Sequence, residues 1–142
     1  MKNADPHKGR ETGIQFITAE DIEYGDRSVF SELTNWQPLY NLYAAGEVII
    51  VHVELPGVDM SDIIVFLRSR FMIITGTRIT PPGITDTCCV FHNLEIPFGR
   101  FHRRIEFPAP IETKNYQYDL RNGILTIQLQ TVKEKIITVE GG

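Results

Sequence analysis

"VELPGVDMSDIIVFLRSRFMIITGTR", residues 53–78, is the stretch that decides the fold. After a Pro-Gly break it contains two apolar runs, DIIVFLR and FMIITGTR, which only Ser69 and Arg70 separate. Two strand-like runs so close in sequence can pair only if the chain reverses sharply between them. This spacing predicts a β-hairpin with a tight loop.

The segments on either side have the two-residue period of half-buried strands. In EVIIVHVEL, apolar residues alternate with His52 and Glu54. Asn122-Gly123 is a strong signal for a two-residue turn, and the segment after it alternates again. The residues expected on the core face are Ile49, Val51, Val53, Leu55, Leu125, Ile127 and Leu129. About seven short strands without a helical period predict an all-β fold, an antiparallel β-sandwich with exposed sheet edges.

Composition and charge exclude several partners. A chain of 142 residues is long enough for one domain with a core and tails. The formal charge is -4 and the longest basic cluster is Arg103-Arg104, so we expect no nucleic-acid partner. The opening MKNADPHKGRETG lacks the apolar region of a signal peptide, and no stretch approaches the roughly 18 apolar residues of a membrane helix. We therefore expect a cytoplasmic protein without a membrane partner.

The chain divides into three segments: an N-terminal arm at residues 1–35, a strand-rich domain at 36–130 and a C-terminal extension at 131–142. The arm is polar, with patterns for two short helical turns at best, and the alternative is a partly disordered tail. Its scattered apolar residues cannot form a core of their own and must pack elsewhere or stay exposed. The residues concerned are Phe16, Ile17, Ile22, Phe30 and Leu33.

Motifs for catalysis and cofactor binding are missing. The sequence contains no G-x-S-x-G, P-loop, G-x-G-x-x-G or H-E-x-x-H pattern. The best metal candidate is CCVFH, where Cys88, Cys89 and His92 lie close together, but a closed zinc site requires four ligands and the other histidines have no matching spacing. The two adjacent cysteines are more simply small apolar residues of a short strand. We expect no metal, no cofactor and no catalytic residue.

Arg103 is unusual because it shares a predicted strand face with Phe101, Ile105 and Phe107. Removing a guanidinium from water costs several kcal/mol unless it is paired. We expect Arg103 to pair with a carboxylate or to reach an interface, and the alternative is that its side chain extends to the sheet edge.

The stretches ELPGV, IITGTR, GRFHRRIEFP and NGILTI occur in an order and spacing that resemble the small heat-shock protein family, whose shared core is the alpha-crystallin domain. The resemblance covers about residues 36–130. Gly99-x-Phe101-x-Arg103 followed by Pro108 is similar to the family's strand motif, and Gly123-Ile124-Leu125 to its turn motif. Two positions depart from the pattern, because Phe107 stands where Leu is usual and Tyr118 where a small residue is typical.

The resemblance implies an immunoglobulin-like sandwich and an ATP-independent holdase, not an enzyme. Such a chaperone binds unfolding client proteins, prevents their aggregation and assembles from dimers into homo-oligomers. On this interpretation the apolar residues of the arm bind clients: Phe16, Ile17, Ile22, Phe30 and Leu33.

The resemblance also implies how dimers form. Residues 79–97 are long for a loop in a compact domain, and CCVFHNLE within them is typical of a strand. In the bacterial and plant type that this chain resembles, that strand crosses to the partner subunit's sheet edge. The implied dimer interface consists of Cys88, Val90 and Leu94, with Arg103 as a further candidate.

The C-terminal tripeptide Ile137-Thr138-Val139 is similar to the family's Ile-x-Ile/Val element. The resemblance implies that Ile137 and Val139 bind in an apolar groove of a neighbouring dimer. The groove is expected between strands at 62–68 and 115–121, with walls from Ile64, Phe66, Tyr118 and Leu120. The preceding TVKEK is a short linker, so folding back onto the same subunit is the alternative.

Two other function classes remain open at this point. A CS-type co-chaperone domain has the same sandwich and acts as an adaptor, but it lacks the long loop and the terminal Ile-x-Val. An enzyme with an unrecognised site is the second alternative.

Overall fold

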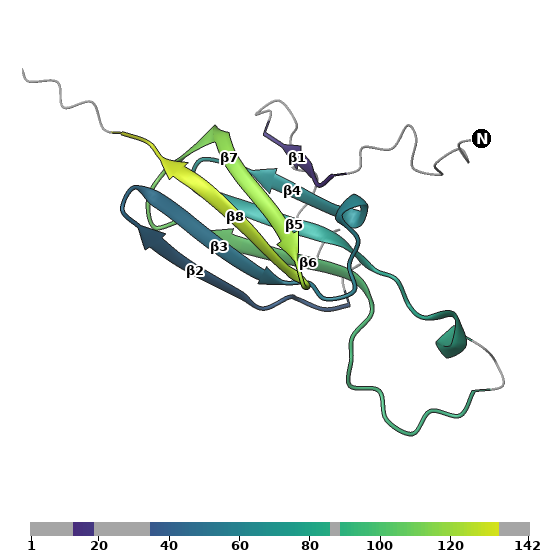
Figure 1. The fold of residues 1–142 in the computed structure, drawn as a ribbon. Helices are drawn as coiled ribbons and strands as arrows, with labels where there is room; N and C mark the ends of the chain where they lie inside the picture. Colours follow the sequence, from purple (N-terminus) through teal and green to yellow (C-terminus); the bar gives the residue numbers. More distant parts are fainter. Residues whose placement is uncertain (1–12, 19–34, 86–88, 134–142) are drawn as a thin grey trace, which may run out of the picture.

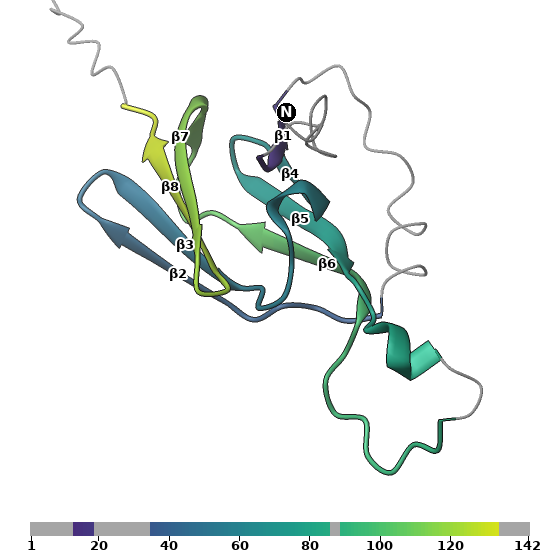
Figure 2. The ribbon, with the colours of Figure 1, turned by 45° about the vertical axis from the view of Figure 1, so that its right-hand side comes forward.

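The computed structural model describes residues 13–18, 35–85 and 89–133, and Figure 1 draws the remainder in grey. The described elements are, in chain order, β1 (Gln15–Ile17), β2 (Tyr40–Ala45), β3 (Val48–Glu54), η1 (Met60–Asp62), β4 (Ile63–Leu67), β5 (Phe71–Arg78), η2 (Pro82–Thr85), β6 (Gly99–Glu106), β7 (Ile111–Arg121) and β8 (Ile124–Thr131). They form two four-stranded sheets, with strand orders β1-β4-β5-β6 and β2-β3-β8-β7. Figures 1 and 2 show the sheets as the two layers of a sandwich, which confirms the predicted all-β fold.

The predicted hairpin at residues 63–78 is the pair β4–β5. Its antiparallel register runs from Ile63 opposite Gly76 to Leu67 opposite Met72. Gly76 allows the backbone to approach its neighbours closely, because a Cβ at this position would collide with the carbonyl oxygen of Asp62 and the ring of Phe101. The hairpin therefore holds the centre of its sheet tightly against β6.

The predicted turn at Asn122-Gly123 joins β7 to β8. Both residues have positive φ, 53° and 79°, which is what a type I′ hairpin turn requires. The backbone NH of Leu55 donates to the carbonyl oxygen of Gly123 at 2.7 Å. This hydrogen bond joins the Pro-Gly break that follows β3 to the turn at the end of β7.

The core lies between the two sheets and contains the residues that the alternation predicts. From β3 and β8 and the residue after β3 come Ile49, Val51, Val53, Leu55, Leu125, Ile127 and Leu129, all buried. Phe101 and Ile105 of β6 are fully buried on the other side. Each such side chain contributes roughly 1.5–3 kcal/mol by leaving water. The sandwich therefore closes its core without help from a second chain.

The helical turns expected in the N-terminal arm lie outside the described residues, and the described part of the arm forms a short strand. Residues 15–17 form β1, which runs parallel to β4 and pairs with it from Gln15 opposite Ile64 to Ile17 opposite Phe66. All other strand pairs are antiparallel. The outer edge of β4 has backbone NH and carbonyl groups that need hydrogen-bond partners. Three residues of the arm are enough to supply them, and the short strand β1 results.

Candidate functional site

The first candidate site is the place where the β4 edge of one sheet lies across from β7 of the other. We call it the β4–β7 seam and define it by Ile63 and Val65 of β4 and by Tyr116, Tyr118 and Leu120 of β7. The two β4 side chains are buried in the core, whereas Tyr118 is 37% exposed. Tyr116 and Leu120 pack against the core while remaining partly exposed. The seam is thus an apolar strip at the surface with the core as its floor.

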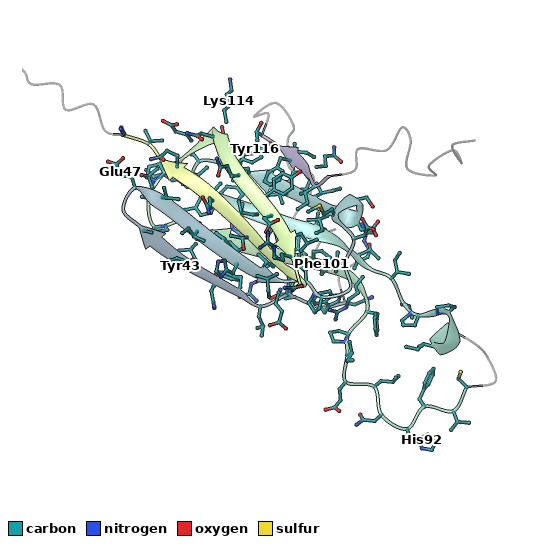
Figure 3. The ribbon with its side chains drawn as sticks, in the orientation of Figure 1. Tyr43, Glu47, His92, Phe101, Lys114 and Tyr116 are labelled. Atoms are coloured by element: carbon teal, nitrogen blue, oxygen red, sulfur yellow. The ribbon has the colours of Figure 1, made fainter. Side chains whose placement is uncertain are left out.

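β1 occupies the β4–β7 seam. Ile14, the residue before β1, is only 6% exposed and belongs to the core cluster. The Phe16 ring stacks on Tyr116 with centroids 4.2 Å apart and lies 5.1 Å from the Tyr118 ring. Arg68 Nη1 donates to the carbonyl oxygen of Ile17 at 3.1 Å. Figures 2 and 3 show β1 beside β4, with Tyr116 nearby on β7.

Two of the predicted groove walls lie on the face of β4 that is turned away from the seam. Side chains alternate along a strand, and Ile63 and Val65 point into the core, so Ile64 and Phe66 lie on the opposite face of β4. Tyr118 and Leu120 lie on the seam side as expected. The departure from the family pattern at Tyr118 has a local reason, because this ring is part of the aromatic surface that Phe16 contacts.

The predicted client-binding residues divide into two groups. Phe16 and Ile17 are partly buried in β1 rather than free on an arm, because they add to the β4 edge. The remaining predicted site residues of the arm and tail lie outside the described residues, as does one cysteine: Ile22, Phe30, Leu33, Cys88, Ile137 and Val139.

The second candidate site is the loop after β5, which we call the projecting loop and define as residues 79–98, described at 79–85 and 89–98. Figures 1 and 3 show it extending away from the sandwich, with His92 near its far end. Most of its large apolar side chains are exposed, including Val90 at 78% and Leu94 at 60%. Cys89 is exposed and its Sγ lies 2.7 Å from the carbonyl oxygen of Gly83. The loop therefore presents apolar surface that the sandwich does not cover.

Residues 89–98 form no strand in the single chain, which differs from the strand predicted for CCVFHNLE. A β-strand requires a neighbouring strand to accept and donate its backbone hydrogen bonds. The projecting loop lies away from both sheets, so the chain itself supplies no such neighbour. The alternating composition is compatible with a strand only where another edge is available.

Arg78, at the end of β5, fixes both ends of the projecting loop. Its guanidinium donates to the carbonyl oxygens of Pro56 at 3.1 Å and Pro97 at 3.0 Å. It also lies over the ring of Trp36, 4.1 Å from the centroid. Burial lowers the pKa of Arg78, and the charge of Glu54 acts in the opposite direction.

Sequence reasoning missed Arg78, although a signal was present. Positions 72, 74, 76 and 78 share the core-facing side of β5, and Arg78 is only 7% exposed. A charged residue at the end of an inward-facing series requires polar partners, which here are backbone carbonyl groups at the base of the loop.

Arg103 reaches across to the other sheet. Its Nη1 donates to Oε1 of Gln37 at 3.3 Å, and its guanidinium lies over the ring of Tyr40, 4.7 Å from the centroid. The described partners are therefore an amide and an aromatic ring rather than the expected carboxylate. They lie just before and at the start of β2, so Arg103 is positioned beside the β2 edge.

The outer strands of the second sheet differ in how they present their edges. Among the described residues, β2 pairs only with β3 and β7 pairs only with β8. β2 has the sequence YNLYAA, without charge or proline, whereas β7 carries four charged residues and a register shift between Ile111 and Tyr116. Charges and irregularities protect an edge against pairing, and a flat uncharged edge invites it. β2 is therefore the more receptive edge.

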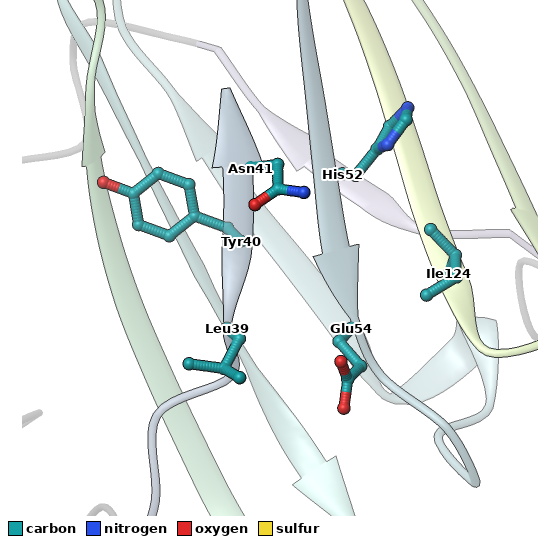
Figure 4. A pocket seen from close by; sticks show the side chains of 6 residues that line it. All are labelled: Leu39, Tyr40, Asn41, His52, Glu54 and Ile124. Atoms are coloured by element: carbon teal, nitrogen blue, oxygen red, sulfur yellow. The ribbon is translucent and has the colours of Figure 1, made fainter. Parts of the chain in front are cut away.

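A shallow hollow lies on the exposed face of β2, β3 and β8 (Figure 4). Its lining residues are Leu39, Tyr40, Asn41, His52, Glu54 and Ile124. In Figure 4 the His52 ring and the Glu54 carboxylate point toward opposite ends of it. The His52 Nε2 atom lies 3.3 Å from the Tyr43 hydroxyl, a contact on the sheet surface. The lining residues of this hollow thus form no converging acid–base pair.

Comparisons with known proteins agree with this architecture. The model of the Hsp20/alpha crystallin family matches residues 44–140. Spore protein SP21 of Stigmatella aurantiaca is 32% identical over 92 residues, which cover 65% of this chain and 53%, about half, of that protein. Heat shock protein 16 of Schizosaccharomyces pombe is 29% identical over 118 residues, 75% of this chain and 82% of that protein.

A solved structure gives the same result for the fold. Heat shock protein 16.0 from Schizosaccharomyces pombe aligns with a TM-score of 0.62 and 29% identity, over 71% of this chain and 92% of that one. Within the described residues, the chain has no helix with the length and apolar character needed to cross a membrane.

Proposed function

Because this chain belongs to the Hsp20/alpha-crystallin family of small heat-shock proteins, a family of chaperones rather than enzymes, we propose that it is an ATP-independent holdase. It binds unfolding client proteins in the cytoplasm and assembles from strand-exchanged dimers into homo-oligomers. In this proposal residues 1–35 are the arm, 36–130 the alpha-crystallin domain and 131–142 the assembly tail.

One observation carries the proposal: the core of the sandwich is complete, yet the projecting loop exposes large apolar side chains. The apolar side chains of the loop do not pack in this core, so they are available for contacts with other chains. A CS-type adaptor would have no such loop, and the family match favours the holdase over that alternative.

In the dimer, residues 88–95 of the projecting loop add to the β2 edge of a second copy. The added strand gains the backbone partners that it lacks in the single chain, and the β2 edge gains protection. Cys88, Val90 and Leu94 supply apolar contacts. Arg103 is held by Gln37 and Tyr40 beside this edge, and it serves as a contact for the incoming strand.

Higher assembly uses the tail. Ile137 and Val139 of one dimer bind the β4–β7 seam of a neighbour, where Tyr118 and Leu120 are retained as walls and Val65 replaces Ile64 and Phe66. Two buried side chains provide only weak affinity after the cost of ordering the tail. Several tails tethered to one particle raise the effective concentration, so the assembly is stable while its subunits still exchange.

Client proteins are held by the apolar residues of the arm, Ile22, Phe30 and Leu33. Phe16 and Ile17 join them when β1 leaves the sheet. Unfolding clients expose apolar segments, and burial of apolar surface requires no nucleotide.

Light scattering of a heat-destabilised model client tests the holdase proposal. We expect a stoichiometric amount of the protein to suppress scattering without ATP. The variant Phe30→Ser with Leu33→Ser should lose much of this effect, whereas Ser31→Ala with Glu32→Ala, in the same segment, should retain it. If the unaltered protein leaves scattering unchanged, the holdase proposal is wrong.

A further inference from the structure

The β4–β7 seam already has an occupant from its own chain. We propose that it is a binding site with two alternative ligands, in which β1 excludes the Ile137-Thr138-Val139 element of a neighbouring copy. This inference rests on the proposed function for its second ligand, and the first ligand is the strand that the structure describes.

The resident ligand binds through two side chains on one face. Ile14 and Phe16 are two residues apart, so an extended backbone sends both toward the core. Ile14 is almost completely buried, and Phe16 stacks on Tyr116. The backbone contributes the parallel pairing with β4, centred on Phe16 opposite Val65.

The tail element has the same pattern. Ile137 and Val139 are also two residues apart, with one polar residue between them, as Gln15 separates Ile14 from Phe16. An extended segment of this kind requires an edge for its backbone and an apolar strip for two side chains. The β4–β7 seam offers both, and the chemistry of the two ligands is equivalent.

Exclusion follows from the topology. A strand has two edges, and β5 pairs with one edge of β4 along five residue pairs. β1 pairs with the other edge along three residue pairs. A tail that docks on β4 must therefore replace β1, because no third edge exists. The shorter pairing of β1 makes it the ligand that can leave.

The exchange couples assembly to client binding. When a tail takes the seam, Phe16 and Ile17 are released and become available to apolar clients. When β1 returns, the tail loses its site. The apparent affinity of the tail is reduced by the fraction of molecules in which the seam is open, so a strand seated nine-tenths of the time weakens it about tenfold.

A fluorescein-labelled peptide with the sequence TVKEKIITVEGG, residues 131–142, tests this inference by fluorescence anisotropy. The host is the full chain with Ile137→Ser and Val139→Ser, so that its own tails do not compete. Adding Ile14→Ser and Phe16→Ser to this host should tighten peptide binding about tenfold. Adding Gln15→Ser alone, at the exposed position on the other face of β1, should leave it unchanged.

Because Ile14 is buried, Ile14→Ser could unfold the host. Two further measurements distinguish that outcome from an opened seam. Phe16→Ala alone, at a half-buried position, should give an intermediate gain in affinity. An unlabelled peptide ETGIQFIT, residues 11–18, should displace the labelled tail peptide from the Ile14→Ser, Phe16→Ser host.

The possible failures are distinguishable. Equal affinity of the tail peptide for all hosts, without displacement by ETGIQFIT, would overturn the exclusion by β1 and leave the tail proposal intact. Absence of tail binding to every host would overturn the tail proposal, and the exclusion with it.

Discussion

β1 and the projecting loop are both short, alternating apolar segments outside the core of the sandwich, yet they end in opposite environments. β1 pairs with β4 and buries Ile14 to 6% exposure. In the projecting loop Val90 stays 78% exposed and Leu94 60%. The sequences are similar in character, so composition does not explain the difference.

The difference arises from how each segment is attached. β1 precedes the strand-rich domain in sequence and pairs with the outer edge of β4. The projecting loop is held at both ends by Arg78, whose hydrogen bonds join Pro56 and Pro97, and Figure 1 shows it leading away from both sheets. Residues 89–98 of this loop pair with no strand among the described residues. In the proposed dimer, β1 therefore pairs within its own chain and the projecting loop pairs with another chain.

The largest expected effect comes from removing the loop's apolar residues. Replacing residues 85–95 with a Gly-Ser linker should convert dimers to monomers, because two buried side chains at roughly 1.5–3 kcal/mol each correspond to about a hundredfold or more in the dimer dissociation constant. Native mass spectrometry at micromolar concentration measures the outcome. His92→Ser with Asn93→Ser is the matched control and should remain dimeric. Dimers formed by the linker variant would place the interface elsewhere.

A substitution at Arg78 tests whether the hydrogen bonds at the base of the projecting loop keep it away from the sheets. Arg78→Met should lower the free energy of unfolding by about 3 kcal/mol, since it leaves carbonyl groups without their charged donor and removes the contact with Trp36. It should also weaken the dimer by releasing the loop. Urea unfolding measures the first effect, with exposed Arg100→Met as the control, expected to stay within about 0.5 kcal/mol. Equal losses in the two variants would contradict the role of Arg78.

The contribution of β1 to its own subunit should be smaller. Ile14→Ala is expected to cost about 1 kcal/mol, less than is usual for a buried isoleucine, because a strand seated about nine-tenths of the time contributes at most about 1.4 kcal/mol in all. Gln15→Ala, exposed on the other face, should change stability by less than about 0.5 kcal/mol. Thermal unfolding of dilute protein checks both values. A loss at Gln15 as large as that at Ile14 would mean that side-chain burial does not hold β1.

The smallest expected effect is on the pH dependence of stability, and it comes from His102 of β6 rather than from β1 or the projecting loop. Burial lowers the pKa of His102 below its ordinary value of 6.5. The unfolded chain therefore binds more protons as the pH falls through about 6.5, so the free energy of unfolding decreases on acidification. His102→Gln should flatten this dependence between about pH 7 and 5. An unchanged slope in the variant would assign the acid sensitivity to other groups.

The sandwich could be predicted from sequence because its strands and turns have recognisable local sequence patterns. The alternation from Ile49 to Leu55 and the Asn122-Gly123 turn each follow from the backbone geometry of a few neighbouring residues. The faces of β4 could not be predicted, because IIVFL is apolar throughout and offers no polar residue to mark the solvent side. The sequence therefore could not show that Ile64 and Phe66 lie on the face of β4 opposite to the buried Ile63 and Val65.

The site depended on contacts between segments far apart in sequence. Three residues, Gln15–Ile17, are too few for a periodic signal, so β1 is visible only once the open edge of β4 is known. Arg78 is likewise separated from Pro97 by the whole projecting loop. Residues 89–98 form no strand in the single chain, and in the proposed dimer the edge that they need comes from a second copy.

The central claim is that the projecting loop pairs with another chain, whereas β1 pairs within its own chain. Hydrogen–deuterium exchange at two protein concentrations, above and below the dimer dissociation constant, tests it most directly. We expect amides of residues 89–96 and of β2 to lose protection together on dilution, because each supplies the other's hydrogen bonds in the dimer. Amides of β1 should keep or gain protection, because their partner β4 is in the same chain. Loop protection that does not depend on concentration, or β1 protection lost together with that of the loop, would contradict this account.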